Sequence, residues 1–199
     1  ETVEFTYTTQ GGETEAVVSS DDNTASTSLT VNEPANFEVD INDADSTTTV
    51  TNGSEVVVNA TVTNTGDLED TQTINFSVDG ANEGSQQVTL ASGEIQTVEF
   101  SYTTQGGETE AVVSSDDDTA DTSLTVNEPA NFGVSINDAD STTTVTNGSE
   151  VVVNATVSNT GDLEDTQTVN LTVAGTTVDS QEVTLASGAG ETIELSYTT

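Results

Sequence analysis

The sequence predicts an all-β protein built from tandem immunoglobulin-like β-sandwich domains of seven to eight strands each. Apolar and polar residues alternate in short runs such as Phe37-Glu38-Val39-Asp40-Ile41, and no helical period is present. Turn signals separate these runs about every 8 to 12 residues. The sequence also repeats after 95 residues: residues 1–104 align with residues 96–199 without a gap, and 83 of the 104 pairs are identical.

The alternation places the strands of one repeat in order along the chain. The predicted strands are residues 37–41, 48–51, 55–63, 72–79, 87–90, 97–103, 109–113 and 122–126. Asn52-Gly53 is a two-residue hairpin signal and predicts that 48–51 pairs with 55–63. The stretch 81–84 changes completely between repeats and is expected to be an exposed loop.

One face of each strand is expected to form the core. The predicted inward residues are Val56, Val58, Ala60, Val62, Ile74, Phe76, Val78, Val98, Phe100, Tyr102, Ala111, Val113, Leu124 and Val126. Replacements between the repeats, such as Ile74 by Val169 and Phe76 by Leu171, keep an apolar side chain, as core positions require.

The only two prolines, Pro34 and Pro129, mark the predicted boundaries between repeats. Residues 1–31 are expected to hold the last strands of a partial repeat, and residues 36–126 a complete repeat. Residues 131–199 are expected to hold the first strands of another partial repeat, and residues 32–35 and 127–130 are the linkers between them.

Two interpretations of the partial repeats stay open. The sequence is either a window on a longer continuous array, or 131–199 is completed by 1–31 of a neighbouring chain through strand donation. The strand Thr2–Thr8 duplicates Thr192–Thr198, so an exchange would supply one strand twice, which favours the first interpretation. In both cases the chain's partner is itself, in a head-to-tail array, with lateral association as a further option.

The charge is extreme, with 36 Asp and Glu residues, no Lys, Arg or His, and a net charge of −36. Such repulsion is screened in molar salt, where the Debye length is about 3 Å, so the composition indicates a halophilic, archaeal source. An acidic disordered tail is the alternative, and the regular apolar pattern disfavours it. Direct binding to nucleic acid is excluded for want of cations. No apolar run approaches the length of a membrane span, so no membrane insertion is expected in this segment.

Six sequons recur at three positions of each repeat and predict N-linked glycans as covalent partners. They are Asn52, Asn59, Asn75, Asn147, Asn154 and Asn170. The strand pattern places them opposite the core faces or in a turn, toward solvent. Chance occurrence is the alternative, because Asn, Ser and Thr are abundant in the chain.

Acidic residues near the linkers are candidate ligands for a structural Ca²⁺ ion at each domain junction. They are Glu33, Asp43 and Asp45 in one repeat and Glu128, Asp138 and Asp140 in the next. The pattern is not an EF-hand, and a hydrated acidic surface explains these residues equally well. No other cofactor is expected.

Catalysis has few available groups, because the chain contains no His, Cys or Lys. A carboxylate pair could hydrolyse glycosides, but small loops on a near-identical repeat offer no cleft. We therefore expect no enzymatic activity.

Three segments carry a resemblance to a known family: Asn64-Thr65-Gly66-Asp67, Thr89-Leu90-Ala91-Ser92-Gly93-Glu94 and Thr97-Val98-Glu99-Phe100-Ser101-Tyr102. Together they resemble the CARDB (cell-adhesion-related) family of Ig-like surface repeats, as in large surface or filament proteins of haloarchaea. The resemblance implies a structural or adhesive element of an extracellular filament, stalk or adhesin shaft, with no catalytic residues. The alternative is a spacer or carbohydrate-binding module of a larger surface protein. The few aromatic residues fall mostly on inward faces, which disfavours a carbohydrate platform.

Overall fold

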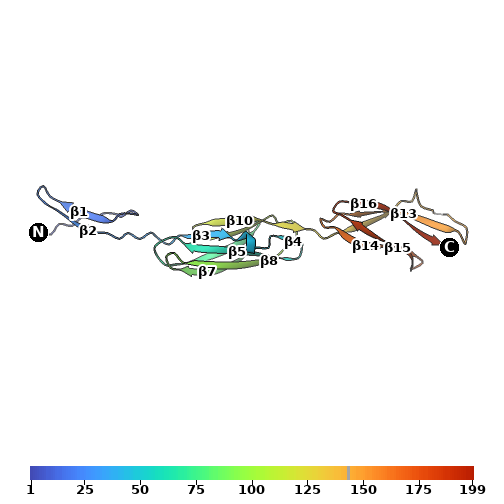
Figure 1. Cartoon of the computed structure of the whole chain (residues 1–199), viewed down its shortest axis with the longest axis horizontal. Helices are drawn as coiled ribbons and strands as arrows, with labels where there is room; N and C mark the ends of the chain where they lie inside the picture. Colours follow the sequence, from blue (N-terminus) through green and yellow to red (C-terminus); the bar gives the residue numbers. More distant parts are fainter. Residues whose placement is uncertain (143) are drawn as a thin grey trace. The chain divides into compact units, whose positions relative to one another are not determined.

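The computed structural model describes residues 1–142 and 144–199, and the regular structure within them is β-strand apart from one short turn of 3₁₀ helix (Figure 1). Contacts between residues divide it into two compact units. The first comprises Glu1–Thr48, Val56–Tyr102 and Thr109–Leu124, and the second comprises Thr49–Glu55, Thr103–Glu108 and Thr125–Thr199.

The first unit contains a hairpin, a sandwich and one turn of 3₁₀ helix, η1 (Asp43–Asp45). The hairpin is β1 (Glu15–Ser19) with β2 (Thr24–Ser28). The sandwich strands are β3 (Phe37–Ile41), β5 (Glu55–Asn64), β6 (Asp70–Val78), β7 (Ala81–Leu90), β8 (Ile95–Thr103), β9 (Glu110–Ser114) and β10 (Thr119–Ser123).

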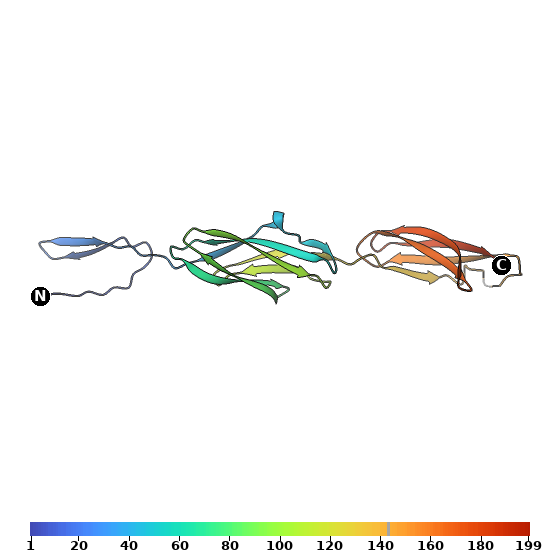
Figure 2. The same ribbon diagram turned by 90° about the horizontal axis from the view of Figure 1, so that it is seen from below.

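These seven strands form two facing sheets, ordered β3-β5-β8 and β10-β9-β6-β7 (Figure 2). Alternate residues of each strand point into the space between the sheets, so the polar residues between them face water. Val56, Val58, Ala60 and Val62 of β5 are fully buried, as the alternation predicts. Nearly all the predicted core residues are buried; Tyr102 and Val126 are half-buried.

Two aromatic rings join the sheets at the centre of this core. Phe76 of β6 and Phe100 of β8 stack with their ring centroids 5.2 Å apart and their planes inclined by 9°. Because the two strands belong to different sheets, this contact ties the layers together.

The predicted hairpin at Asn52-Gly53 forms only in part. The turn forms, with Gly53 at φ 83°, and Thr47 makes an isolated antiparallel bridge with Val57. However, β4 (Thr49–Thr51) pairs in parallel with β11 (Thr125–Asn127) rather than with β5. The reason is Thr104, which accepts from the N–H of Gly53 and donates its own N–H to Ser54. These bonds hold the turn beside β8 and leave β4 free to pair elsewhere. The predicted strand 122–126 is correspondingly divided between β10 and β11.

The stretch 81–84 is also not the predicted loop. It is exposed, but it forms the first part of β7 and pairs with β6. The cause is the turn before it, where Asp79 and Gly80 have φ of 45° and 80°. Positive φ at both turn residues is the geometry that closes a tight hairpin, so β7 begins directly after the turn.

The second unit contains β4, β11 and an open half of a sandwich. Its strands are β12 (Phe132–Ile136), β13 (Glu150–Asn159), β14 (Asp165–Val173), β15 (Thr176–Leu185) and β16 (Gly190–Thr198), in sheets ordered β12-β13-β16 and β14-β15. A small core contains Ala155, Val157, Val183, Leu185, Ile193 and Leu195. Val134 and Ile136 of β12 are 56% and 58% exposed, whereas Val39 at the matching place in β3 is 7% exposed.

Candidate functional site

The linker residue Glu128 is held by a side chain from the turn after β4. The Asn52 Nδ2 donates to both Glu128 carboxylate oxygens at 3.1 Å. Gly106 leaves the room for this contact, because a Cβ there would lie 2.5 Å from Glu128 Oε1 and 2.7 Å from Asn52 Nδ2. Gly11 likewise makes room for Glu33, because a Cβ added at Gly11 would lie 1.8 Å from Glu33 Oε1.

The backbone of Glu128 is fixed as well. Its N–H donates to Asp162 Oδ2 at 2.8 Å, and its carbonyl accepts from the N–H of Asp162 at 3.0 Å. Glu33 and Asp67 exchange the same pair of bonds at 2.9 and 3.1 Å. Gly161 completes the arrangement, because a Cβ there would lie 1.9 Å from the Pro129 carbonyl oxygen. Each linker glutamate is therefore held by main-chain bonds and by close packing.

The carboxylates proposed as calcium ligands do not come together. Glu33 pairs with Asp67 rather than with Asp43 or Asp45, which lie in η1. Asp43 Oδ1 accepts from the Thr122 hydroxyl at 3.2 Å. Among the described residues, no three acidic side chains lie close enough to hold a metal ion. The residues therefore do not fit the expected junction site.

Their counterparts in the second unit are equally dispersed. Asp140 and Asp138 make these bonds through their main-chain carbonyls. The Asp140 carbonyl accepts from Asn154 Nδ2 at 2.7 Å, and the Asp138 carbonyl accepts from the N–H of Ser141. Glu128 is occupied by Asn52. These bonds assign the residues a local structural role.

The six sequon asparagines differ in exposure. Asn147 and Asn170 are exposed, whereas Asn52, Asn59, Asn75 and Asn154 are half-buried. The amide nitrogen is the atom that carries a glycan, and in Asn59 it donates to the Asp45 carbonyl at 2.8 Å. Asn52 and Asn154 have their amide nitrogens bonded too. Glycosylation at these three positions requires the existing hydrogen bond to be broken, so Asn147 and Asn170 are the more accessible acceptors.

Sequence reasoning missed a second acidic feature, the turn between β9 and β10, which holds the outer edge of β3. The N–H groups of Phe37 and Val39 donate to the carboxylates of Asp117 and Asp118 at 2.9 and 3.0 Å. The Ser115 hydroxyl donates to the Phe37 carbonyl at 2.7 Å. These side chains satisfy an edge that would otherwise be open to another strand. We call this arrangement the edge clamp.

The clamp carboxylates are stabilised in their charged form. The pKa of Asp117 lies below its ordinary value because the Phe37 N–H and then the Gln72 amide donate to it. The pKa of Asp118 is lowered by the N–H of Val39 and then that of Thr119. The sequence signal was only a run of three aspartates after a strand, which reads equally well as a solvated turn.

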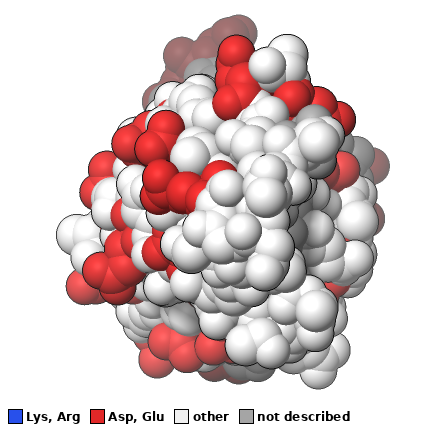
Figure 3. Space-filling view, turned by 90° about the vertical axis from the view of Figure 1, so that its right-hand side faces the viewer, with Lys and Arg blue, Asp and Glu red and all other residues white. Residues whose placement is uncertain are grey.

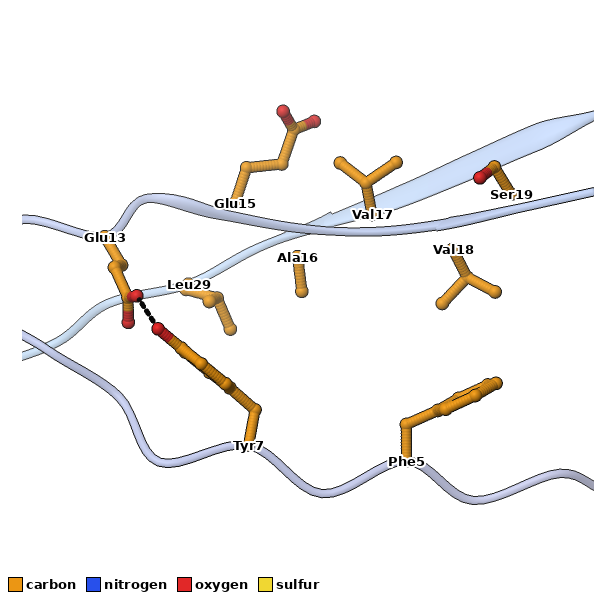
Figure 4. Close-up of a pocket in the computed structure, with 9 residues that line it drawn as sticks. All are labelled: Phe5, Tyr7, Glu13, Glu15, Ala16, Val17, Val18, Ser19 and Leu29. Atoms are coloured by element: carbon orange, nitrogen blue, oxygen red, sulfur yellow. Dashed lines mark hydrogen bonds between the residues drawn. The ribbon is translucent and has the colours of Figure 1, made fainter.

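The β1–β2 hairpin has an apolar face that is only loosely covered (Figure 4). Phe5 and Tyr7 point toward the face formed by Ala16, Val18 and Leu29, and the five residues line one pocket. Phe5, Tyr7 and Val18 remain 74%, 71% and 56% exposed. A hydrogen bond to Glu13 raises the pKa of Tyr7 and lowers that of Glu13.

The surface carries one sign of charge. The face in Figure 3 displays Asp and Glu side chains and no Lys or Arg, as the composition requires. Within residues 1–142 and 144–199, no helix has the length and hydrophobicity needed to span a membrane.

Comparison with known proteins identifies a family over more than half of the chain. The family model described as CARDB matches residues 29–131. No curated protein matches the chain.

Solved structures give weaker similarities. The CARDB domain of a Pyrococcus furiosus protein, in complex with di-metal ions, is 14% identical over 48% of this chain and 96% of that one, with a TM-score of 0.39. A Listeria innocua β-glucosidase in complex with glucose is 17% identical over 47% of this chain, with a TM-score of 0.38. An Erythrobacter marinus β-glucosidase is 19% identical over 46%, with a TM-score of 0.36. The chain covers only 16% and 15% of the two glucosidases, and similarities this weak carry no argument about function.

Proposed function

Because the chain belongs to the CARDB family, a family of β-sandwich domains associated with cell-surface proteins, we propose that it is a structural segment of an extracellular array. The array consists of tandem Ig-like sandwiches with a 95-residue repeat and forms a filament, stalk or adhesin shaft on a halophilic, archaeal cell. The segment has no enzymatic activity, and its partners are further copies of the same sandwich.

The observation that carries this proposal is that both linker glutamates, Glu33 and Glu128, are held by specific hydrogen bonds. A flexible tether would leave Glu33 and Glu128 without fixed contacts. Both side chains are exposed here, but the main chain of each makes two hydrogen bonds with an aspartate, Asp67 or Asp162: its N–H donates to the aspartate carboxylate, and its carbonyl accepts from the aspartate N–H. Asn52 also donates to the Glu128 carboxylate. Linkers that are ordered in this way suit a load-bearing array, in which little conformational entropy remains to be lost under tension.

The surface chemistry supports an extracellular, high-salt setting. A net charge of −36 destabilises a compact fold in dilute solution and is tolerated where salt screens it. Glycans on the exposed sequons Asn147 and Asn170 would cover part of the sheet surface and hinder sideways pairing.

A spacer or carbohydrate-binding module is the second candidate. The only strongly exposed aromatic side chains in the described residues are Phe5 and Tyr7. Their counterparts in the repeat are Phe100, which is 6% exposed, and Tyr102, which is half-buried. The pair therefore resembles core residues that lack a complete sandwich, rather than a platform for a sugar ring. The structural function is favoured for this reason.

Surface labelling of intact cells tests the proposal. An antibody against the chain, applied in molar salt, is expected to label unpermeabilised cells, and brief external protease treatment is expected to remove the label. A cytoplasmic marker must stay protected throughout as the control. Labelling that appears only after permeabilisation would overturn the extracellular assignment. A sugar-dependent change in melting temperature would favour the binding module.

A further inference from the structure

Two short strands and one turn hold the start of the second linker. We propose that β4, β11 and the contact between Asn52 and Glu128 form a strap that carries tension applied through the linker 127–130. The inference rests on the proposed array function and deepens it by naming the bonds that bear the load. All residues of the strap lie within the second compact unit.

The strands β4 and β11 run in the same direction, and this orientation decides how tension acts on them. The register pairs residues 125–127 with residues 49–51. The linker continues from the end of β11, so a pull on the linker draws β11 along its own axis past β4. Because the hydrogen bonds of a ladder lie across its strands, such a pull loads all of them together. A pull that separates the two strands from one end would instead break the bonds one at a time.

Two bonds from Asn52 extend this ladder into the linker. The Asn52 N–H donates to the Asn127 carbonyl at 2.9 Å, and its Nδ2 donates to both carboxylate oxygens of Glu128 at 3.1 Å. A hydrogen bond to a charged acceptor is stronger than a neutral one. Since Glu128 is the first residue after β11, its bond to Asn52 is loaded before the ladder is.

Glu128 is also bonded on the other side, toward the strands that follow the linker. Its N–H donates to Asp162 Oδ2 at 2.8 Å, and its carbonyl accepts from the Asp162 N–H at 3.0 Å. The main chain of Glu128 is thus fixed to the turn after β13, and its side chain is fixed to the turn after β4. Tension that reaches this residue therefore passes directly to Asn52.

Thr104 anchors the turn at Asn52. It is 2% exposed and directly follows β8. Its carbonyl and hydroxyl oxygens accept from the Gly53 N–H at 3.2 and 3.1 Å, and its own N–H donates to the Ser54 carbonyl at 3.0 Å. A pull on Glu128 is thereby passed through the turn to Thr104 and along the chain into β8.

The same anchored turn recurs in the second repeat. The Gly148 N–H donates to the carbonyl and hydroxyl oxygens of Thr199 at 3.1 and 2.9 Å, and the Thr199 N–H donates to the Ser149 carbonyl at 3.0 Å. These three residues lie 95 positions after their counterparts in the first turn. The anchor is therefore a property of the repeat rather than of one junction.

Single-molecule force spectroscopy of the full chain, produced without glycans and held in molar KCl, tests the proposal. The chain has no cysteine, so it can be tethered at chosen points, and Glu1→Cys with Thr198→Cys loads the linkers. Unfolding of residues 36–126 is recognised by the release of about 300 Å of chain, since an extended residue spans about 3.3–3.6 Å. At constant force, Asn52→Asp is expected to unfold this repeat about tenfold faster than the wild type, because two carboxylates then face each other at Glu128.

Exchange of donor and acceptor is the decisive step. In the Asn52→Asp, Glu128→Gln double variant, the glutamine amide donates to the aspartate carboxylate, so a charged bond is restored in the reverse direction. The net charge is the same as in the wild type, and the unfolding rate is expected to recover most of the difference. Asn82→Asp is the matched control, because this exposed residue of β7 adds the same charge away from the strap. It should unfold like the wild type.

A second pair of tethers separates the bearing of load from general stability. Glu69→Cys and Glu99→Cys lie at exposed positions, and the segment between them contains neither strand of the strap nor Thr104. With these tethers, Asn52→Asp and the wild type should unfold at the same rate. Equal rates with the end tethers, equal acceleration with both pairs of tethers, or no recovery in the double variant would overturn the proposal. None of these results would change the surface labelling, which tests the array function separately.

Discussion

Asn64 is the residue whose replacement should damage the complete sandwich most specifically. It is fully buried, and its Nδ2 donates to the carbonyls of Leu68 and Leu90 at 2.8 and 3.0 Å. Its Oδ1 accepts from the N–H groups of Asn36 and Gly66 at 3.2 and 3.0 Å. Every polar atom of this side chain is therefore used, and Asn64→Asp changes the chemistry with almost no change of shape.

The expected cost follows from these contacts. In Asn64→Asp, one carboxylate oxygen still accepts from the N–H groups of Asn36 and Gly66. The other oxygen replaces Nδ2, so the carbonyls of Leu68 and Leu90 lose their donor and face a negative charge. Breaking a buried polar network in this way, with a charge left uncompensated, costs about 3–5 kcal/mol. For a sandwich of this size, a loss of about 3 kcal/mol lowers the melting midpoint by at least about 12 °C.

The penalty should also depend on pH. Burial against carbonyl oxygens raises the pKa of the new carboxyl above its unfolded value of about 3.9. The folded state then binds the proton more tightly than the unfolded state does. The variant therefore loses stability relative to the wild type as the pH rises above about 4, and it recovers part of that stability on acidification.

Scanning calorimetry in molar KCl measures the midpoints, and hydrogen exchange of the β5 and β6 amides assigns the loss to this sandwich. Asn36→Asp is the control, because Asn36 is exposed and the substitution adds the same charge nearby. It is expected to cost under about 1 kcal/mol. If Asn64→Asp melted like Asn36→Asp and showed no pH dependence relative to the wild type, the assigned role of the buried amide would be wrong.

Three further predictions concern the clamp, the linker and the charge. Since the pKa values of Asp117 and Asp118 are lowered on folding, the stability they add is complete above about pH 4 and is lost as the pH falls through their folded values. In the Asp117→Asn, Asp118→Asn double variant, the melting midpoint should therefore fall less steeply than in the wild type as the pH is lowered below about 4. The same fall in both proteins would contradict the role assigned to the clamp. Gly106→Ala should lower the free energy of unfolding by about 1–2 kcal/mol more than Gly107→Ala. Both glycines have positive φ, but only a Cβ at position 106 would crowd Glu128 and Asn52. Equal melting midpoints of the two variants would refute the contact. The midpoint of the wild type should rise steeply from low to molar salt, and a curve indifferent to salt would refute the halophilic assignment.

The strands were predictable wherever local alternation determines them. The inward faces of β5 and β6 follow directly from period-two patterns such as Val56, Val58, Ala60 and Val62, and the structure buries these residues. The family resemblance came from the same turn and core positions, and the match over residues 29–131 confirms it. Such positions are set by the strand pattern itself, so they can be read without knowledge of distant partners.

Pairing between distant segments was not predictable in the same way. β4 leaves the expected hairpin because its partner, β11, lies more than 70 residues further along the chain. The edge clamp joins Phe37 to Asp117 across a sequence separation of 80 residues. Asn64 was read as part of a polar turn, although its side chain is buried, because sequence pattern does not show which turn residue points inward.

Cryo-electron microscopy of the native material in molar salt tests whether the chain belongs to a structural array. We expect continuous filaments or rods made of successive sandwiches, with the linker glutamates ordered between them. Isolated sandwiches with disordered linkers, or a short tether that ends in a separate globular enzyme, would contradict the structural role.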